Sequence, residues 1–388
     1  MRIVNVIGAR PNLMKMAPLM RAWAAHPNVE PVLVHTGQHS DPAMSDIHFL
    51  DLGLRQPDVN LGISGGSHAE QHSGVMIAFE RFLGECNPDL VVVVGDVNST
   101  VSCALVAAKL GVRVAHVEAG LRSFERNMPE EINRILTDQV SDYLFVSEKS
   151  ALFNLEREGI KHGGVQFAGS VIIDSLDFVR PRVRDSDILS RIGVDKRGYA
   201  VLTLHRASNV DDDATLEQIL ASMERIACHL PVLYVSHPRT QKRIAELNGG
   251  RPRRLAGVTM VPPLGYIDFI KLVSDSRVVF TDSGGLQEES TVLGVPCITL
   301  RDSTERPCTI ESGTNRLAGT APESIFQVFD AAMCQSCGVV QRPPKWDGRA
   351  AERITAFLAR QPASPRPNSL DQLEHKLVLA ANCEEVQR

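Results

Sequence analysis

The sequence of 388 residues has few aromatic side chains, no excess of basic charge and no long apolar run. Aromatic residues make up 5% of it, so we expect aliphatic cores, as in sheets covered by helices. Lys and Arg number 41 against 46 Asp and Glu, and the resulting formal charge of −5 gives no support to general binding of nucleic acid or anionic membranes. Apolar stretches such as residues 90–94 have the length of a strand and fall far short of a membrane span.

Several motifs and signals are also missing. The N-terminal segment has no small-residue cleavage site and is typical of a first strand, and the eight cysteines are spread as in reduced proteins, so we expect a cytoplasmic protein. Cys334 and Cys337 form a single CxxC pair without further ligands, and we expect no metal there. The chain has neither a Walker loop nor a clean GxGxxG, which disfavours nucleotide hydrolysis and nicotinamide binding.

The chain does contain a regular alternation of short β-branched runs and helical patterns. Strands that are apolar on both faces and separated by helices are typical of parallel sheets covered on both sides. The predicted strands are 2–7, 31–35, 90–94, 112–117, 143–146 and 165–168 in the first half, and 200–204, 232–235, 258–261, 278–281 and 297–300 in the second. The predicted fold class is α/β, with two Rossmann-like, doubly wound domains.

Charge and proline interrupt this pattern at residues 180–185, and the interruption indicates a domain boundary nearby. We expect an N-terminal domain over residues 1–172 and a C-terminal domain over residues 173–346. Gln361 begins a Pro-rich stretch that precedes an amphipathic segment, so residues 361–388 are predicted to be a linker and a tail helix.

Polar and glycine-rich residues gather where the predicted strands end. Eight of these ends contain GARP, TGQH, GDVNST, HVEAGLR, HR, SHPR, DSGG and RDSTER. In open parallel sheets, ligands bind beyond the carboxyl ends of the strands. Eight polar ends in two facing sheets therefore predict one cleft between the domains. His237 of SHPR is a candidate cleft residue, although backbone groups could equally satisfy a histidine at a strand end.

In the segment TDSGGLQEE, a strand turns through small residues directly into a helix. The N–H groups of residues 283–285 would face the crevice at the positive end of the helix dipole, which suits a phosphate. Glu289 lies further along the helix, where a carboxylate could accept ribose hydroxyls. Arg10 and Lys15 would add positive charge opposite this seat, as a diphosphate requires. A helix cap without ligand, and a solvated helix start, are the alternatives.

Three carboxylates and a histidine offer proton transfer beside the seat. Asp96 and Glu118 follow adjacent strands, Glu130 begins a helix, and His205 ends a strand of the second half. Several proton carriers around a bound leaving group are a reactive arrangement, although each carboxylate singly could be a helix cap or a dipole partner. Metal binding is disfavoured, because no DxD-like pair or His–Glu cluster accompanies them. His116, two residues before Glu118 in the strand, is a candidate for orienting that carboxylate.

Taken together, these segments resemble a known family. GARPNLMKMAP, TGQH, GDVNST, HVEAGLRS, MPEEINR, TLHRASNVDD, SHPR, DSGGLQEE and RDSTERP are similar to segments of the non-hydrolysing UDP-N-acetylglucosamine 2-epimerases. The resemblance implies a two-domain glycosyltransferase-B-like fold facing a cleft, whose C-terminal helix at about residues 347–360 packs back onto the first domain. It also implies no added cofactor, usually a homodimer, and the synthesis of surface polysaccharide precursors.

The implied reaction interconverts UDP-GlcNAc and UDP-ManNAc. UDP is expelled across the C1–O bond while a base removes the C2 proton, which gives bound 2-acetamidoglucal, and both add back with C2 inverted. Because the C2 hydrogen is not acidic, this chemistry depends on departure of the leaving group. It therefore needs positive charge around the diphosphate and carboxylates around the sugar.

By position, the resemblance makes Asp96, Glu118 and Glu130 the acid/base carboxylates, and His205 the group that assists phosphate departure and return. Which carboxylate takes the C2 proton stays open. The candidate substrate-binding residues are Arg10, Lys15, Phe269, Ser283, Gly284, Gly285, Glu289, Arg306 and His237. Among them, residues 283–285 would seat the diphosphate, Glu289 would bind the ribose and Phe269 would lie near the uracil.

Two departures and three alternatives remain. The first departure is HRASN, which replaces the HRxEN form of better-known members. The second is the TGQH loop, near which some relatives have a site for substrate-activated regulation. Here this loop continues as SDPAMSD, so retention of that site stays open. A family branch acting on UDP-2,3-diacetamido-2,3-dideoxy-glucuronic acid shares HxEAGLRSF and MPEEINRILTDQVSD, whereas TERP and SGGLQEE favour UDP-GlcNAc. A glycosyltransferase of the same fold and a non-catalytic nucleotide-sugar sensor are the other two readings.

Overall fold

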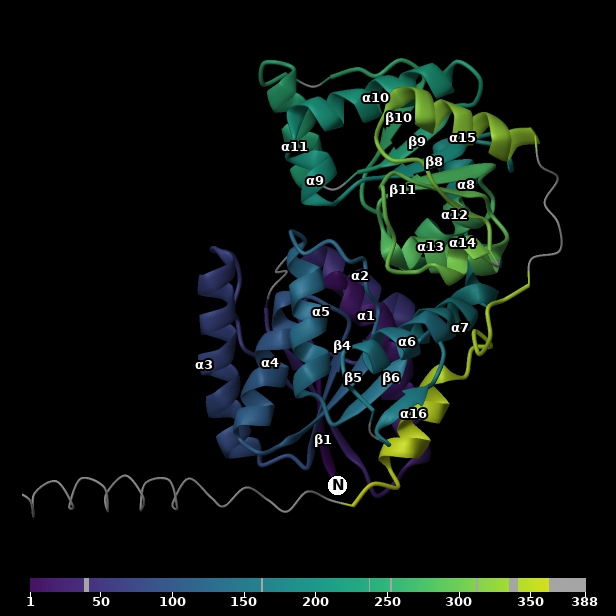
Figure 1. Cartoon of the computed structure of the whole chain (residues 1–388). Coiled ribbons are helices and arrows are strands. Elements are labelled where there is room, and N and C mark those ends of the chain that lie inside the picture. Colours follow the sequence, from purple (N-terminus) through teal and green to yellow (C-terminus); the bar gives the residue numbers. More distant parts are fainter. Residues whose placement is uncertain are drawn as a thin grey trace, which may run out of the picture.

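The computed structural model describes residues 1–37, 42–161, 163–236, 238–251, 253–311, 313–334 and 341–362. Over these ranges the chain forms two bodies, each built on a parallel sheet with helices around it (Figure 1). The first half of the chain builds the lower body in Figure 1, and the second half builds most of the upper one.

The sheet of the first body has the strand order β3-β2-β1-β4-β5-β6-β7. Its strands are β1 (Arg2–Ile7), β2 (Glu30–His35), β3 (Val59–Asn60), β4 (Leu90–Val94), β5 (Arg113–Ala119), β6 (Tyr143–Val146) and β7 (Val165–Phe167). The intervening helices are α1 (Arg10–Ala22), the 3₁₀ turn η1 (Trp23–Ala25), α2 (Pro42–Leu52), α3 (His68–Cys86), α4 (Asn98–Lys109), α5 (Pro129–Val140) and α6 (Lys149–Arg157). The strand order reverses between β1 and β4, so the crevice of this sheet opens at their carboxyl ends.

The sheet of the second body has the order β10-β9-β8-β11-β12-β13. Its strands are β8 (Ala200–Thr203), β9 (Val232–Val235), β10 (Val258–Val261), β11 (Val278–Thr281), β12 (Cys297–Thr299) and β13 (Asn315–Leu317). The remaining helices are α7 (Val171–Asp185), α8 (Ile188–Ile192), α9 (Ala207–Val210), α10 (Asp213–Ala227), α11 (Pro238–Leu247), α12 (Tyr266–Ser274), α13 (Gly284–Leu293), α14 (Cys308–Glu311), α15 (Pro322–Cys334) and α16 (Ala350–Leu358). Here the order reverses between β8 and β11, which places a second crevice at their carboxyl ends.

Alternate residues of a strand face two different cores, as a sheet covered on both sides requires. In β1, Ile3 and Ile7 pack in the core formed with α1, α7 and α16. Val4 and Val6, on the opposite face, pack in the core formed with α3 and α4. Both faces are therefore buried, and this explains why the strands are continuous β-branched runs rather than alternating patterns.

The structure confirms the predicted α/β class with two doubly wound parallel sheets. Every predicted strand is present, with its ends within two residues of the prediction. The prediction missed β3 and β13, which are edge strands of two and three residues that contain asparagine. Segments this short that also contain a polar residue have no apolar run from which a strand could be predicted.

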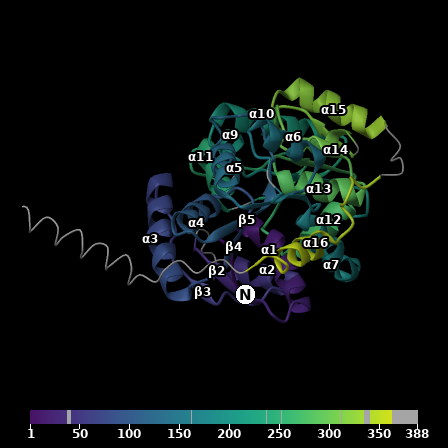
Figure 2. The same ribbon diagram turned by 60° about the horizontal axis from the view of Figure 1, so that its bottom comes forward.

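The charged and Pro-containing stretch 180–185 forms the last part of α7, which continues to Asp185. Pro181 is exposed, whereas Val179 and Val183 lie one turn apart on the buried face, and this face keeps the helix packed. The last described helix, α16, returns to the first body and lies beside α1 and α7 (Figure 2). The limits at residues 172 and 346 stay a prediction, and residues 363–388 lie outside the described ranges.

Among the helices that the described ranges contain, none combines the length and the apolar character needed to cross a membrane.

Candidate active site

Buried charged side chains from both bodies meet at the carboxyl ends of the two sheets. Arg306, in the loop after β12, pairs with Glu118 of β5, with Glu288 of α13 and, at 2.7 Å, with the adjacent Glu305. These four residues, which we name the Arg306 cluster, have side chains at most 6% exposed. Burial acts to lower the pKa of Arg306, but the three carboxylates hold it well above its usual value. Since Glu118 comes from the first sheet, the cluster joins the two bodies.

Glu118 has a second cationic partner and a strained backbone. Lys15 of α1 pairs through Nζ with Oε2 of Glu118, and both side chains are buried. Glu118 has a φ of 73°, and the pairing of β5 with β6 shifts register at this residue. A left-handed backbone at a residue other than glycine costs about 1–3 kcal/mol, and such strain concentrates at functional sites.

The bulge at Glu118 overturns the expected role of His116. The His116 ring is fully occupied, with Nδ1 at 2.6 Å from Asp138 Oδ1 and Nε2 at 2.9 Å from the carbonyl oxygen of Gly95. The prediction that it orients Glu118 was wrong, because the bulge rotates Glu118 out of the strand alternation. Gly95 has a φ of 65°, and a Cβ there would overlap Nζ of Lys15, so glycine leaves the room that Lys15 needs.

Asp96 follows β4 at the same edge of the first sheet. Its Oδ2 lies 2.9 Å from Nη1 of Arg134 on α5, and its side chain is 26% exposed. Burial alone would raise the pKa of Asp96, but the charges of Arg134 and Lys15 lower it below the ordinary value. Asp96 is therefore ionised at neutral pH and can accept a proton.

Two adjacent glutamates at the start of α5 have different environments. Glu131 is 1% exposed, accepts hydrogen bonds from the backbone N–H groups of Ser123 at 3.0 Å and Phe124 at 2.9 Å, and pairs with Arg134 at 3.0 Å. Glu130 is half-buried and forms no hydrogen bond or ion pair with the rest of the described chain. Glu131 therefore stabilises the loop before α5, whereas the predicted acid/base residue Glu130 is available to a ligand.

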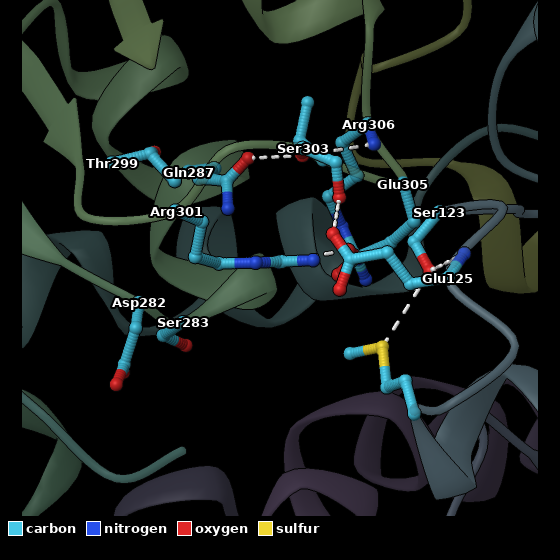
Figure 3. A network of polar contacts seen from close by, with 12 residues as sticks. Ser123, Glu125, Asp282, Ser283, Gln287, Thr299, Arg301, Ser303, Glu305 and Arg306 are labelled. Carbon is cyan, nitrogen blue, oxygen red and sulfur yellow. Dashed lines mark hydrogen bonds and ion pairs between the residues drawn. The ribbon is translucent and has the colours of Figure 1, made fainter. Parts of the chain in front are cut away.

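The loop that carries Arg306 is tied to its surroundings by charge pairs (Figure 3). Glu305 pairs with Arg301 at 2.9 Å and with Arg206 at 3.5 Å. Burial acts to raise the pKa of Glu305, but Arg206, Arg306 and Arg301 hold it well below its usual range. Across the gap between the bodies, the Ser303 hydroxyl donates a hydrogen bond to Glu125.

The predicted phosphate seat is the start of α13. The N–H of Ser283 donates to the Thr281 hydroxyl at 3.0 Å, so the free amides of the first turn are those of Gly284 and Gly285. A Cβ at Gly284 would overlap Oε1 of Glu305 and Nη1 of Arg306, so this ion pair lies directly against the first turn of the helix. The two backbone donors and the helix dipole suit an anion, while the charge of Arg306 is already matched by its carboxylate partners.

Glu289 lies further along α13, is 4% exposed and accepts a hydrogen bond of 2.6 Å from the Tyr266 hydroxyl. Burial raises the pKa of Glu289 to about 7. Arg10, at the start of α1, lies near this carboxylate; burial lowers the pKa of Arg10 and Glu289 opposes that effect. Arg10 has no polar partner among the described residues, which leaves its guanidinium for a ligand. Phe269 of α12 is half-buried and packs against cores of both bodies.

The exposed ring of His205 pairs with a buried carboxylate. Its side chain is 55% exposed, and its Nδ1 lies 2.7 Å from Oδ1 of Asp282, which is fully buried. Contacts between described residues thus join Lys15, Glu118, Arg306 and Gly284 across the two bodies, and Asp282 joins His205 to the start of the predicted seat. His237 and the loop residues Gln38 and His39 lie outside the described ranges.

Sequence reasoning missed the three buried acids Asp282, Glu288 and Glu305. Each stands next to a predicted residue: Asp282 directly follows β11, Glu288 lies in α13, and Glu305 lies in the loop between β12 and α14. The sequence offers no signal that separates Glu288 and Glu305 from solvated acids, because their burial depends on cations that come from other segments. Only Asp282 carried a usable signal, since it follows β11 directly and precedes the seat.

Two facing, doubly wound sheets with a helix N-terminus and a carboxylate cluster between them define a protein of the glycosyltransferase-B-like class. A family model described as UDP-N-acetylglucosamine 2-epimerase matches residues 21–359. The chain belongs to the UDP-N-acetylglucosamine 2-epimerase family, a family of isomerases.

Individual relatives are similar over nearly their whole length. A UDP-N-acetylglucosamine 2-epimerase of Methanocaldococcus jannaschii is 39% identical over 92% of this chain and 99% of its own. A UDP-2,3-diacetamido-2,3-dideoxy-D-glucuronate 2-epimerase of Pseudomonas aeruginosa is 38% identical over 93% of this chain and 100% of its own. The crystal structure of the M. jannaschii UDP-GlcNAc 2-epimerase in complex with UDP-GlcNAc and UDP superimposes with a TM-score of 0.88, at 38% identity over 93% of this chain and 100% of that one.

The Arg306 cluster leads to a stability prediction. In R306M, Glu118, Glu288 and Glu305 stay buried without their shared cation. Removing one partner of a buried ion pair costs about 3–5 kcal/mol, and we expect the free energy of unfolding in urea to fall by that amount. The double variant R306M/E288Q should recover part of the loss, because one buried negative charge is gone. An R306M protein as stable as the wild type would contradict the cluster.

Proposed function

We propose that the protein catalyses the reversible C2 epimerisation of UDP-GlcNAc to UDP-ManNAc, through elimination of UDP to a bound 2-acetamidoglucal and its re-addition. One observation carries the proposal. Glu118, from the first sheet, contacts Arg306, whose guanidinium lies against the first turn of α13. The carboxylate that would accept the proton and the proposed anion seat are thus linked through one residue, Arg306.

The chemistry requires this proximity. The C2 hydrogen of the sugar is not acidic, so its removal has to accompany departure of UDP from C1. Cleavage of the C1–O bond sends the electron pair to the diphosphate, the C2 proton passes to a carboxylate, and a double bond forms between C1 and C2. Preorganised positive charge at the departing oxygen lowers the barrier most.

The proposed binding roles follow the position of each group. The free amides of Gly284 and Gly285 and the guanidinium of Arg10 would hold the diphosphate. Glu289 would accept hydrogen bonds from the ribose hydroxyls, and Phe269, one turn after Tyr266 on α12, would lie near the uracil. The positive charges of the cleft thereby gather at the leaving group.

The proposed catalytic roles belong to the edge of the first sheet and to one histidine. Asp96, Glu118 and Glu130 would exchange protons with the sugar, and His205 would assist phosphate departure and return. Lys15 contacts Glu118 and would hold that carboxylate in place. Because C2 is inverted, the group that takes the proton and the group that returns one lie on opposite faces of the sugar, and both regain their starting state by proton exchange with water. No electrons are gained or lost overall, so the proposal needs no added cofactor.

The charge pairing of the cleft favours UDP-GlcNAc over the diacetamido-glucuronate sugar on which the P. aeruginosa relative acts. A sugar carboxylate needs a cation of its own. Lys15, Arg134 and Arg306 are each paired with protein carboxylates, so among the described residues they offer no spare positive charge. The neutral hydroxymethyl group of UDP-GlcNAc makes no such demand.

We also propose a cytoplasmic homodimer that supplies surface polysaccharide precursors, with domain limits at residues 172 and 346. Ile132 and Leu136 lie one turn apart on α5 and are 44% and 50% exposed. An apolar pair on one helix face is more stable when a partner covers it, which supports self-association.

Incubation of the purified protein with UDP-GlcNAc in deuterated water tests the proposed function. We expect UDP-ManNAc to form with deuterium at C2, as followed by proton NMR, and no free ManNAc to accumulate. UDP-2,3-diacetamido-2,3-dideoxy-glucuronic acid, run in parallel, distinguishes the two substrates. Retention of the C2 hydrogen in both sugars, or transfer of the sugar to an acceptor, would contradict the proposal.

The two adjacent glutamates of α5 are a matched pair for testing the carboxylate assignment. E130Q should lower kcat by about 10²–10⁴-fold and leave the unfolding midpoint unchanged, because the Glu130 carboxylate forms no hydrogen bond or ion pair with another described residue. E131Q should lower the midpoint by several degrees, because it weakens the buried bonds to the loop before α5. Steady-state kinetics and thermal unfolding of both variants test this assignment. An E130Q protein with wild-type kcat would show that Glu130 takes no part in the reaction.

A further inference from the structure

Strand register places Asp282 beside His205. β8 and β11 pair in parallel, with Thr203 opposite Thr281. The residues just beyond these strands therefore emerge as neighbours at the carboxyl edge of the second sheet. His205 Nδ1 lies 2.7 Å from Asp282 Oδ1, within hydrogen-bond distance.

Asp282 is held rigidly and is ionised. Besides the ring, it accepts hydrogen bonds from the backbone N–H groups of His205 at 3.1 Å and Arg206 at 3.0 Å, and from Asn209 Nδ2 at 3.3 Å. Burial alone would raise the pKa of Asp282, but His205 and these hydrogen bonds lower it to about 2. At neutral pH the group is a carboxylate that can only accept hydrogen bonds.

Because Asp282 can only accept hydrogen bonds, it determines which nitrogen of the His205 ring carries a proton. The hydrogen on Nδ1 must point at Asp282, so Nε2 is the nitrogen left for a ligand. The His205 side chain is 55% exposed while Asp282 is fully buried, so the ring extends outward from its partner. Ser283, the first residue of the anion seat, follows Asp282 directly, and one short backbone segment thus holds both the histidine and the seat.

We propose that Asp282 is a positioning residue for the reaction: it fixes the His205 ring with Nε2 toward the departing diphosphate and balances the charge of the protonated ring. When the C1–O bond breaks, its electron pair leaves with UDP, and the ring gives its Nε2 proton to a phosphate oxygen. On return the oxygen gives the proton back, so His205 and Asp282 end unchanged. This inference rests on the proposed function.

Asn209 provides a matched control that distinguishes the proposed positioning role of Asp282 from a purely structural one. Asn209 Nδ2 donates to Asp282 and, at 3.0 Å, to the carbonyl oxygen of Leu300, so it anchors the same loop. It makes no bond to the His205 ring. N209A therefore loosens the support of the loop and leaves the ring pairing in place, whereas D282N keeps the shape and presents an amide N–H to Nδ1.

The first measurement compares the kinetics of the two variants. D282N should lower kcat by about 10²–10⁴-fold with KM within about 3-fold of the wild type, because an amide N–H that faces Nδ1 disfavours the doubly protonated ring that gives its Nε2 proton to the leaving phosphate. N209A should keep kcat within about 3-fold of the wild type. A D282N protein with wild-type kcat, or an N209A protein as slow as D282N, would overturn the proposal.

The second measurement needs no turnover. In ¹⁵N spectra of the histidine rings, with His205 assigned through H205N, the wild type and N209A should show a protonated Nδ1, and D282N should show an unprotonated Nδ1. H205N/D282N should be no slower than H205N, because Asp282 acts through the ring. A further loss in the double variant, or an unchanged tautomer in D282N, would overturn the proposal. A wild type that exchanges no C2 hydrogen would instead contradict the proposed function.

Discussion

The pairing of Arg306 with Glu118 is the contact on which the arrangement of the cleft depends. A guanidinium buried among Glu118, Glu288 and Glu305 is stable only when all four side chains are present together, because unpaired buried charge is costly. Glu118 belongs to the first body, and Glu288, Glu305 and Arg306 belong to the second. These charges are therefore paired only when the two bodies meet. The left-handed backbone of Glu118 and the glycine at 284 are local conditions for that meeting.

The same contact places the proposed chemistry. Arg306 lies against the first turn of α13, where a diphosphate would be seated, and its partner Glu118 stands beside Asp96 at the edge of the other sheet. Leaving-group stabilisation and proton transfer are therefore supplied from opposite sides of one cleft. The formal charge of −5 conceals this, because the cations are concentrated where the substrate would bind and are matched by carboxylates.

Much of the fold could be predicted from sequence, because both faces of each sheet are buried and their strands are continuous apolar runs. The turn from β11 into α13 at residues 283–285 could be predicted for a similar reason, since a strand that turns through small residues into a helix is a local pattern. Local patterns do not reveal the register shift at Glu118, which made the expectation for His116 wrong. Nor do they reveal that Glu131 is buried and its neighbour Glu130 only half-buried, because the hydrogen bonds to Glu131 depend on how the loop before α5 folds.

Cleavage of the C1–O bond at the α13 seat is the central claim, and positional isotope exchange tests it most directly. UDP-GlcNAc labelled with ¹⁸O in the oxygen that bridges C1 and the β-phosphorus is incubated with the protein, and the recovered nucleotide sugar is analysed by ³¹P NMR. If UDP departs and returns, the label spreads into the non-bridging oxygens of the β-phosphate while deuterium enters C2. Deuterium at C2 with the label still entirely in the bridge would contradict the account.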